Sequence, residues 1–139
     1  MQTVERFELD RDLTLRLGIG SNNMAQAAEI IAHGFDGEAG WPKSDIRAAQ
    51  VWFREVIYEP LTSVGPLRSS NFGTSCLSGN MSMAIFCDDE KMFKAQVSAY
   101  KRGYRKTHDG CCGVAQYIFK STGQAFETQR DQALSLIHI

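Results

Sequence analysis

The stretch that most limits how this chain can fold runs from Asn71 to Phe86, where a helical pattern is built largely from small side chains. Its small residues are Gly73, Ser75, Cys76, Ser78, Gly79, Ser82 and Ala84. The distance between packed helices depends on the side chains at their contact, so small side chains let a helix approach its neighbours closely. We therefore expect this helix to lie at the centre of the fold.

Three further segments place apolar residues three and four positions apart, which is typical of amphipathic helices. They are expected to run from Asn22 to Gly34, from Ser44 to Tyr58 and from Asp88 to Gly103. Pro60 is expected to end the second segment, because proline cannot continue the helical hydrogen bonds. Strand alternation is nowhere sustained, so the predicted fold class is all-α, with antiparallel helices paired through short loops.

Side-chain chemistry predicts the caps and buried faces of these helices. Ser44 is expected to cap the second segment, and Ser21, Asn22 or Asn23 the first. The acidic run from Asp88 to Glu90 favours a helix start, because a helix N-terminus carries partial positive charge. Side chains expected to face inwards include Trp52 and, in the last segment, Met92, Phe93, Val97 and Tyr100.

The composition is that of one ordinary globular domain and excludes several classes of partner. The 139 residues include 15 basic and 16 acidic side chains, so the net charge of −1 does not attract nucleic acid or an anionic membrane. Apolar runs stay shorter than the roughly 18 residues that a membrane-spanning helix needs. We therefore expect neither nucleic acid nor a membrane as a partner.

Familiar catalytic and metal motifs are also missing from the sequence. The stretch Gly73 to Leu77 departs from the G-x-S-x-G nucleophile elbow at its last position, and Gly18-Ile19-Gly20 lacks the third glycine of a dinucleotide loop. The four cysteines show no C-x-x-C spacing, and the three histidines show no metal-binding spacing. We therefore expect no metal and no cofactor.

A polar run from Gly123 to Gln132 predicts one wall of a binding site. Amide groups can donate hydrogen bonds to a carboxylate, and a guanidinium such as that of Arg130 can bind one through two parallel hydrogen bonds. The amides available for this chemistry are those of Asn71, Gln124, Gln129 and Gln132. These residue types favour an acidic ligand. A second polar stretch, from Arg68 to Asn80, has the same character, and the two stretches together suggest a sugar-binding cleft.

Four stretches in combination resemble the alginate-lyase-like polysaccharide lyases, and the likeness covers roughly residues 20 to 132. They are Ser21 to Ile30, Arg68 to Ser75, Met81 to Phe93 and Gly123 to Gln132. The resemblance implies an incomplete (α/α) toroid, in which antiparallel helical hairpins surround a central cleft. It also implies metal-independent β-elimination of an alginate-like or other uronic-acid polymer, by a secreted or periplasmic parent protein.

The same resemblance assigns roles to individual residues. Asn71 matches the family's carboxylate-neutralising asparagine, and Arg130 matches the arginine of its arginine-aspartate-glutamine motif. The side chains expected to contact the substrate are Asn23, Gln26, Gln124, Glu127 and Gln132. The catalytic base is not assigned, and the candidates within the chain are Tyr104, His108 and Tyr117.

Other interpretations of the same residues stay open at this point. Asn71 can simply cap its helix, Arg130 and Glu127 can form a surface ion pair, and Asn23 with Gln26 can form a solvated helix face. As whole-protein alternatives, the chain can be a non-catalytic helical carbohydrate-binding or scaffold protein. It can also be an α-toroid glycoside hydrolase that uses Asp131 or Glu127 as its acid.

The expected domain organisation is one partial toroid domain over residues 1–132, truncated at both ends. Residues 133–139 are expected to be a non-native tail, because the polar pattern stops abruptly after Gln132. The sequence makes no prediction about the oligomeric state.

Overall fold

A computed structural model describes residues 11–64, 70–102 and 121 of the chain, and its regular structure over these ranges is entirely helical. The elements are α1 (Arg11–His33), the 3₁₀ turn η1 (Gly34–Gly37), α2 (Lys43–Trp52), the π-helical segment η2 (Phe53–Tyr58), α3 (Glu59–Val64), α4 (Ser70–Phe86) and α5 (Glu90–Arg102). The all-α prediction is therefore confirmed for the described residues.

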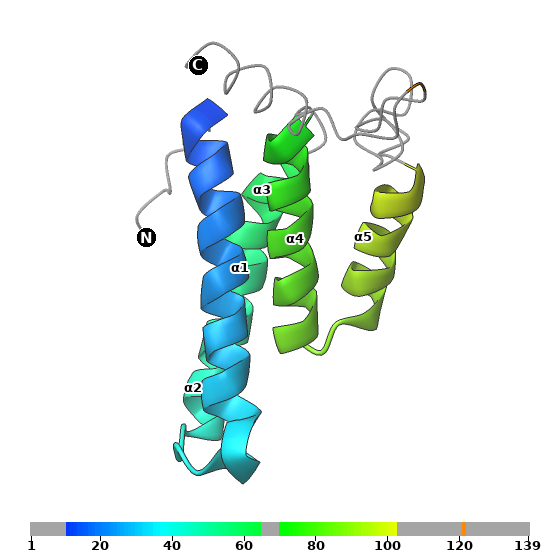
Figure 1. The fold of residues 1–139 in the computed structure, drawn as a ribbon. Coiled ribbons are helices and arrows are strands. Elements are labelled where there is room, and N and C mark those ends of the chain that lie inside the picture. Colours follow the sequence, from blue (N-terminus) through cyan, green and yellow to red (C-terminus); the bar gives the residue numbers. More distant parts are fainter. Residues whose placement is uncertain (1–10, 65–69, 103–120, 122–139) are drawn as a thin grey trace, which may run out of the picture.

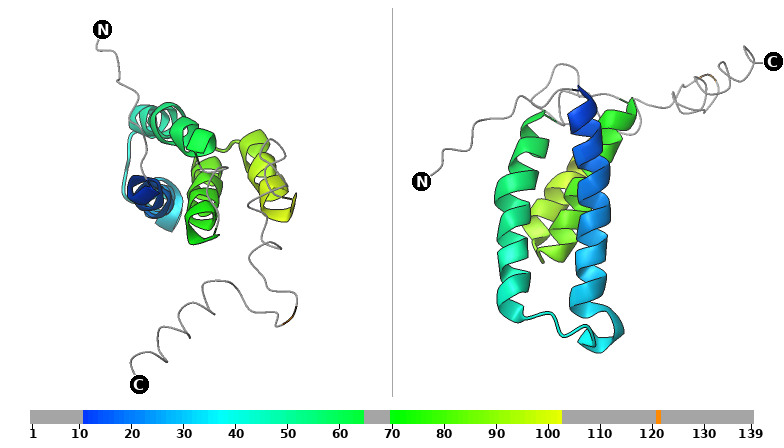
Figure 2. Two further views of the ribbon diagram at one scale, coloured as in Figure 1. Left: turned by 90° about the horizontal axis from the view of Figure 1, so that it is seen from above. Right: turned by 90° about the vertical axis from the view of Figure 1, so that its left-hand side faces the viewer.

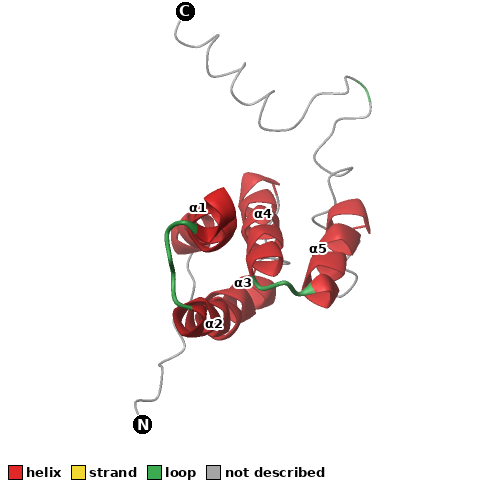
Figure 3. Ribbon diagram, turned by 90° about the horizontal axis from the view of Figure 1, so that it is seen from below, coloured by secondary structure: helices red, strands yellow, loops and turns green. Residues whose placement is uncertain are grey.

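The helices form two successive hairpins. The first pairs α1 with the continuous rod made of α2, η2 and α3, and the second pairs α4 with α5 (Figure 1). Helices α1 and α4 lie side by side and run in the same direction, while the rod lies across one side of this pair (Figures 2 and 3). Helix α5 lies beside α4, away from α1.

The contact between α1 and α4 is a contact between backbones. A Cβ atom added to Gly18 of α1 would lie 2.7 Å from the carbonyl carbon of Ser75 and 2.8 Å from the amide nitrogen of Cys76. A Cβ atom added to Gly79 of α4 would lie 2.7 Å from the carbonyl oxygen of Gly18 and would also meet the Ser21 hydroxyl. The expectation that α4 is central and closely approached is thus confirmed.

Helix α1 begins at Arg11, which is earlier than predicted, so Ser21, Asn22 and Asn23 lie inside the helix and cap nothing. The prediction was wrong because the buried stripe of α1 consists of small residues. Its members are Gly18, Ser21, Ala25 and Ala28. The larger apolar side chains of Met24 and Ile31 are 42% and 48% exposed, so a search for large apolar residues misses this stripe.

The rod also differs from its prediction, because the helix continues through Pro60 to Val64. The π-helical turn just before Pro60 widens the helix where the proline ring would otherwise press on the preceding turn. At the other end Pro42 occupies the N-cap position that was assigned to Ser44. The Ser44 hydroxyl instead donates to the carboxylate of its neighbour Asp45 at 3.0 Å.

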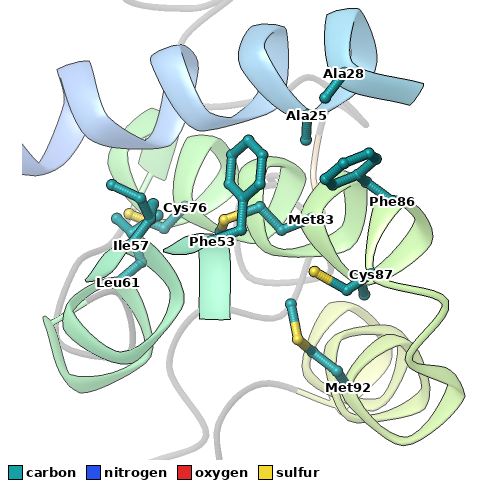
Figure 4. Close-up of a cluster of buried hydrophobic side chains, with 11 residues drawn as sticks. Ala25, Ala28, Phe53, Ile57, Leu61, Cys76, Met83, Phe86, Cys87 and Met92 are labelled. Carbon is teal, nitrogen blue, oxygen red and sulfur yellow. The ribbon is translucent and has the colours of Figure 1, made fainter. Parts of the chain in front are cut away.

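Aromatic rings fill the space between the rod and the α1–α4 pair (Figure 4). Phe86 is 1% exposed and packs edge-on against Phe53 at 5.5 Å between ring centroids. Trp41 also stacks on Phe86, at 6.2 Å between ring centroids and with an angle of 13° between the rings. Trp52, predicted to lie in the core, is 41% exposed and touches only the edge of this cluster through Phe53.

The turn between α4 and α5 fixes the second hairpin. Asp88 adopts a left-handed backbone conformation (φ 51°), which lets the amides of Asp88 and Asp89 bond back to the last carbonyls of α4. The carboxylate of Asp89 then accepts from the amide of Met92 at 2.8 Å. The expected acidic start of the fourth helix is confirmed, with Asp89 as its cap.

Helix α5 is rotated relative to the prediction. Met92 is buried as expected, but Phe93 and Tyr100 are 36% and 45% exposed. Gln96 and Ala99 are buried in their place. Because Gln96 is polar, a prediction from apolar periodicity alone leaves it off the buried face of α5 and places Phe93 and Tyr100 there instead.

The glycine contact predicts opposite effects for two identical substitutions on α1. Gly18→Ala should lower the free energy of unfolding by about 1–3 kcal/mol, because the methyl group must force the two backbones apart. Gly20→Ala should raise it by roughly 0.5–1 kcal/mol, because no atom lies within 4 Å of the new methyl group and alanine favours helix. Chemical denaturation of both variants checks this, and equal effects would contradict the backbone contact.

Candidate functional site

Polar side chains gather where α1 meets α4, next to the glycine contact. We call this cluster the polar seam, and its members are Asn22, Asn23 and Gln26 of α1 with Ser78 and Ser82 of α4. Asn23, Gln26 and Ser78 are exposed, while Asn22 and Ser82 are partly buried. The seam is therefore open to a ligand from outside.

One carbonyl oxygen organises the seam. Asn22 Oδ1 accepts hydrogen bonds from Ser82 Oγ at 2.7 Å, Ser78 Oγ at 3.0 Å and Gln26 Nε2 at 3.0 Å. The Asn22 amide nitrogen donates to Asn23 Oδ1 at 3.4 Å. These bonds join residues that are far apart in the sequence into one small network across two helices.

The network leaves amide N–H groups available to a ligand. A carbonyl oxygen has two lone pairs, yet three donors converge on Asn22 Oδ1. Each side-chain amide also carries a second N–H that these bonds do not use. The exposed side of the seam therefore suits an oxygen-rich ligand that accepts hydrogen bonds.

Of the residues predicted to bind substrate, the structure brings Asn23 and Gln26 together around Asn22. Both side chains are exposed, and Asn22, to which each is hydrogen-bonded, connects them to α4. Sequence reasoning did not single out Asn22, Ser78 or Ser82 as members of the site. The available signal was a pair of polar residues four positions apart on each helix, Asn22 with Gln26 and Ser78 with Ser82.

Position 71 lies in the first turn of α4, because the helix begins at Ser70. It is therefore inside the helix and not the residue before it, where an N-cap would stand. It precedes Ser78 by seven residues, so the two positions share one face of α4 and lie about 10 Å apart along its axis. The polar seam and position 71 thus belong to the same face.

The remaining predicted site residues lie outside the described part of the chain. These are Gln124, Glu127, Arg130 and Gln132, together with the base candidates Tyr104, His108 and Tyr117 and the expected tail at 133–139. Their roles stay predictions.

A second polar cluster is buried on the opposite side of α4. Gln96 Nε2 donates to the Tyr58 hydroxyl at 3.0 Å, and Asn80 Nδ2 approaches Gln96 Oε1 at 3.5 Å. Asn80 is fully buried, and its Oδ1 has no hydrogen-bond partner. Because these side chains come from η2, α4 and α5, the cluster ties the second hairpin to the rod, and its burial closes it to a large ligand.

Burial also sets the protonation of nearby groups. It raises the pKa of Tyr58 above its ordinary value of 10.0, although the Gln96 hydrogen bond acts in the opposite direction. Burial likewise raises the pKa of the Cys87 thiol above 9.0, with Arg54 opposing the effect. Both groups therefore stay neutral at ordinary pH, and neither is an activated nucleophile or base.

In the ranges that the structure describes, no three His, Cys, Asp or Glu side chains lie close enough to share a metal ion. Within the same ranges, every helix is too short or too polar to cross a membrane.

Comparison with known proteins adds no assignment: no family model matches the chain, and no match was found among curated proteins or solved structures.

The Tyr58 environment predicts how stability depends on alkaline pH. Because the folded pKa of Tyr58 is raised, its contribution is fully present below pH 10.0 and is lost as pH rises through the folded pKa. Tyr58→Phe should lower the free energy of unfolding by about 1 kcal/mol at neutral pH, because it removes the Gln96 hydrogen bond. Above pH 10.0 the variant should lose less stability than the wild-type protein, because phenylalanine does not ionise. Denaturation curves across this range check it, and parallel losses in both proteins would contradict it.

Proposed function

We propose that this chain is part of a polysaccharide lyase that cleaves an alginate-like or other uronic-acid polymer by β-elimination. The observation that carries the proposal is the exposed polar seam of amides and hydroxyls, which lies on the same face of α4 as position 71. An acidic polysaccharide is rich in oxygen acceptors, and amide and hydroxyl donors suit such a ligand.

The arrangement of the hairpins also supports the proposal. Helices α1 and α4 are the first members of successive hairpins, and they lie side by side and run in the same direction (Figure 1). A toroid built from helical hairpins repeats this relation from one hairpin to the next. We therefore propose that the two hairpins are part of such a ring, with the polar seam facing its central cleft.

In the proposed reaction Asn71 and Arg130 neutralise the C5 carboxylate of one sugar unit. Their N–H groups donate to the carboxylate oxygens, which take up negative charge as a base removes the C5 proton. The electron pair of the broken C–H bond forms a C4–C5 double bond, and the C4–O bond breaks. An acid then protonates the departing oxygen, and positioned acid and base groups contribute roughly 10²- to 10⁴-fold each.

The proposal extends to the setting of the reaction. The partner is the acidic polymer itself, and the chemistry needs neither a metal nor a cofactor. A long polymer cannot enter a cell, so we propose that the parent protein acts in the periplasm or outside the cell.

One observation favours a second function, in which the same face binds carbohydrate without cleaving it. The polar seam consists only of amides and hydroxyls, none of which titrates near neutral pH. A helical carbohydrate-binding protein needs nothing more. Uronate oligomers that bind without gaining a double bond would favour this second function.

The proposal predicts that Asn71→Ala in the full-length protein lowers turnover of a uronate polymer at least about 10²-fold, because one donor to the developing charge is lost. The free energy of unfolding should change by less than about 1 kcal/mol. Turnover is followed by the ultraviolet absorbance of the unsaturated product. Ser98→Ala, an exposed change on α5, serves as the control and should leave turnover unaltered.

Unchanged product formation by Asn71→Ala, with Ser98→Ala also unaltered, would refute the role assigned to Asn71. Release of saturated products only, by the wild-type protein, would refute β-elimination and favour hydrolysis.

A further inference from the structure

We infer that the polar seam is a separate subsite, which binds the hydroxyl groups of a sugar unit other than the one that is cut. This inference rests on the proposed function for the identity of the polymer. It adds a direction of binding, in which the polymer follows the line between α1 and α4. It also divides recognition between two parts of the site: Asn71 with Arg130 binds the carboxylate, and the polar seam binds hydroxyl groups.

Distance along α4 separates the two parts. Position 71 precedes Ser78 by seven residues and Ser82 by eleven, which is about 10 Å and about 16 Å of helix. A single pyranose ring is shorter than either distance. A ring whose carboxylate lies at position 71 therefore does not extend along α4 to Ser78 or Ser82, and we assign the polar seam to another unit of the same polymer.

The chemistry of the polar seam favours hydroxyl groups over a second carboxylate. Its five members are all uncharged, so none of them supplies the positive charge that Arg130 would bring to the carboxylate of the cut unit. Glu29, partly buried on α1, follows Gln26 by three residues and so shares its face of the helix. Its negative charge disfavours a carboxylate nearby, whereas a hydroxyl can accept from the amides and donate to a serine oxygen.

The crowding at Asn22 Oδ1 explains how a ligand enters without breaking the fold. Three donors share the two lone pairs of this oxygen, so Gln26 and Ser78 can turn to a ligand while the Ser82 hydroxyl still bonds to it. Gln26 and Ser78 are the donors whose side chains are exposed. They are therefore the two that we assign to the sugar, while Asn22 and Ser82 keep the helices together.

The test is calorimetric titration of the full chain with two uncut hexasaccharides, one of uronate units and one in which the carboxylates have been reduced to alcohols. Gln26→Ala and Ser78→Ala should each weaken binding of both hexasaccharides by about 10-fold, the equivalent of about 1.4 kcal/mol. Ser98→Ala is the matched control, since it removes an exposed helical serine elsewhere and should change neither affinity. Thermal unfolding of each variant shows that the fold is retained.

Several results would overturn the subsite. One is that both variants bind both hexasaccharides with wild-type affinity, which would mean that the polar seam only holds α1 and α4 together. A second is loss of binding for the uronate sugar alone, which would mean that the seam reads a carboxylate. A third is a wild-type chain that binds neither hexasaccharide.

The subsite and the lyase can fail separately. Hexasaccharide binding that depends on Gln26 and Ser78, with no unsaturated product formed by the full-length protein, supports the subsite and refutes the lyase. Unsaturated product formed equally well by the seam variants, with unchanged affinity, refutes the subsite alone.

Discussion

The close approach of α1 and α4 is the contact on which the rest of the described structure depends. At Gly18 and Gly79 the two backbones meet with no side chain between them. Each glycine costs roughly 1 kcal/mol of helix propensity relative to alanine, so the contact must return more than that in packing. Its larger consequence is geometric, because it brings Asn22 within hydrogen-bonding distance of Ser78 and Ser82.

The two sides of α4 use polar residues in different ways. On the open side, amides and hydroxyls form the polar seam around Asn22. On the buried side, Asn80, Gln96 and Tyr58 form a network that fixes α5 against the rod. The aromatic cluster around Phe86 supplies the apolar burial that keeps these two networks in place, because its rings join the rod to the α1–α4 pair.

Features that depend on local chemistry could be predicted from the sequence. The all-α class, the span of α4 and the acidic start of α5 follow from spacing, small residues and the cap at Asp89. These features need only neighbours along the chain. The central position of α4 could also be predicted, because small side chains let neighbouring helices approach closely.

Features that depend on distant contacts could not be predicted. The length of α1 was missed because its buried stripe is small and partly polar, and helix continuity through Pro60 was missed because a π-helical turn accommodates the ring. The polar seam was recognised only through Asn23 and Gln26. The central role of Asn22 could not be predicted, because its partners Ser78 and Ser82 lie 56 and 60 positions away in the sequence.

The central claim is that the contact between α1 and α4 builds a surface that binds a uronate polymer. Side-chain amide resonances of Asn22, Asn23 and Gln26, followed by NMR during titration with a uronate oligosaccharide, test it most directly. The account predicts saturable shifts of these resonances, with the buried amides of Asn80 and Gln96 unmoved. Shifts that avoid the seam amides, or no shifts at all, would contradict it.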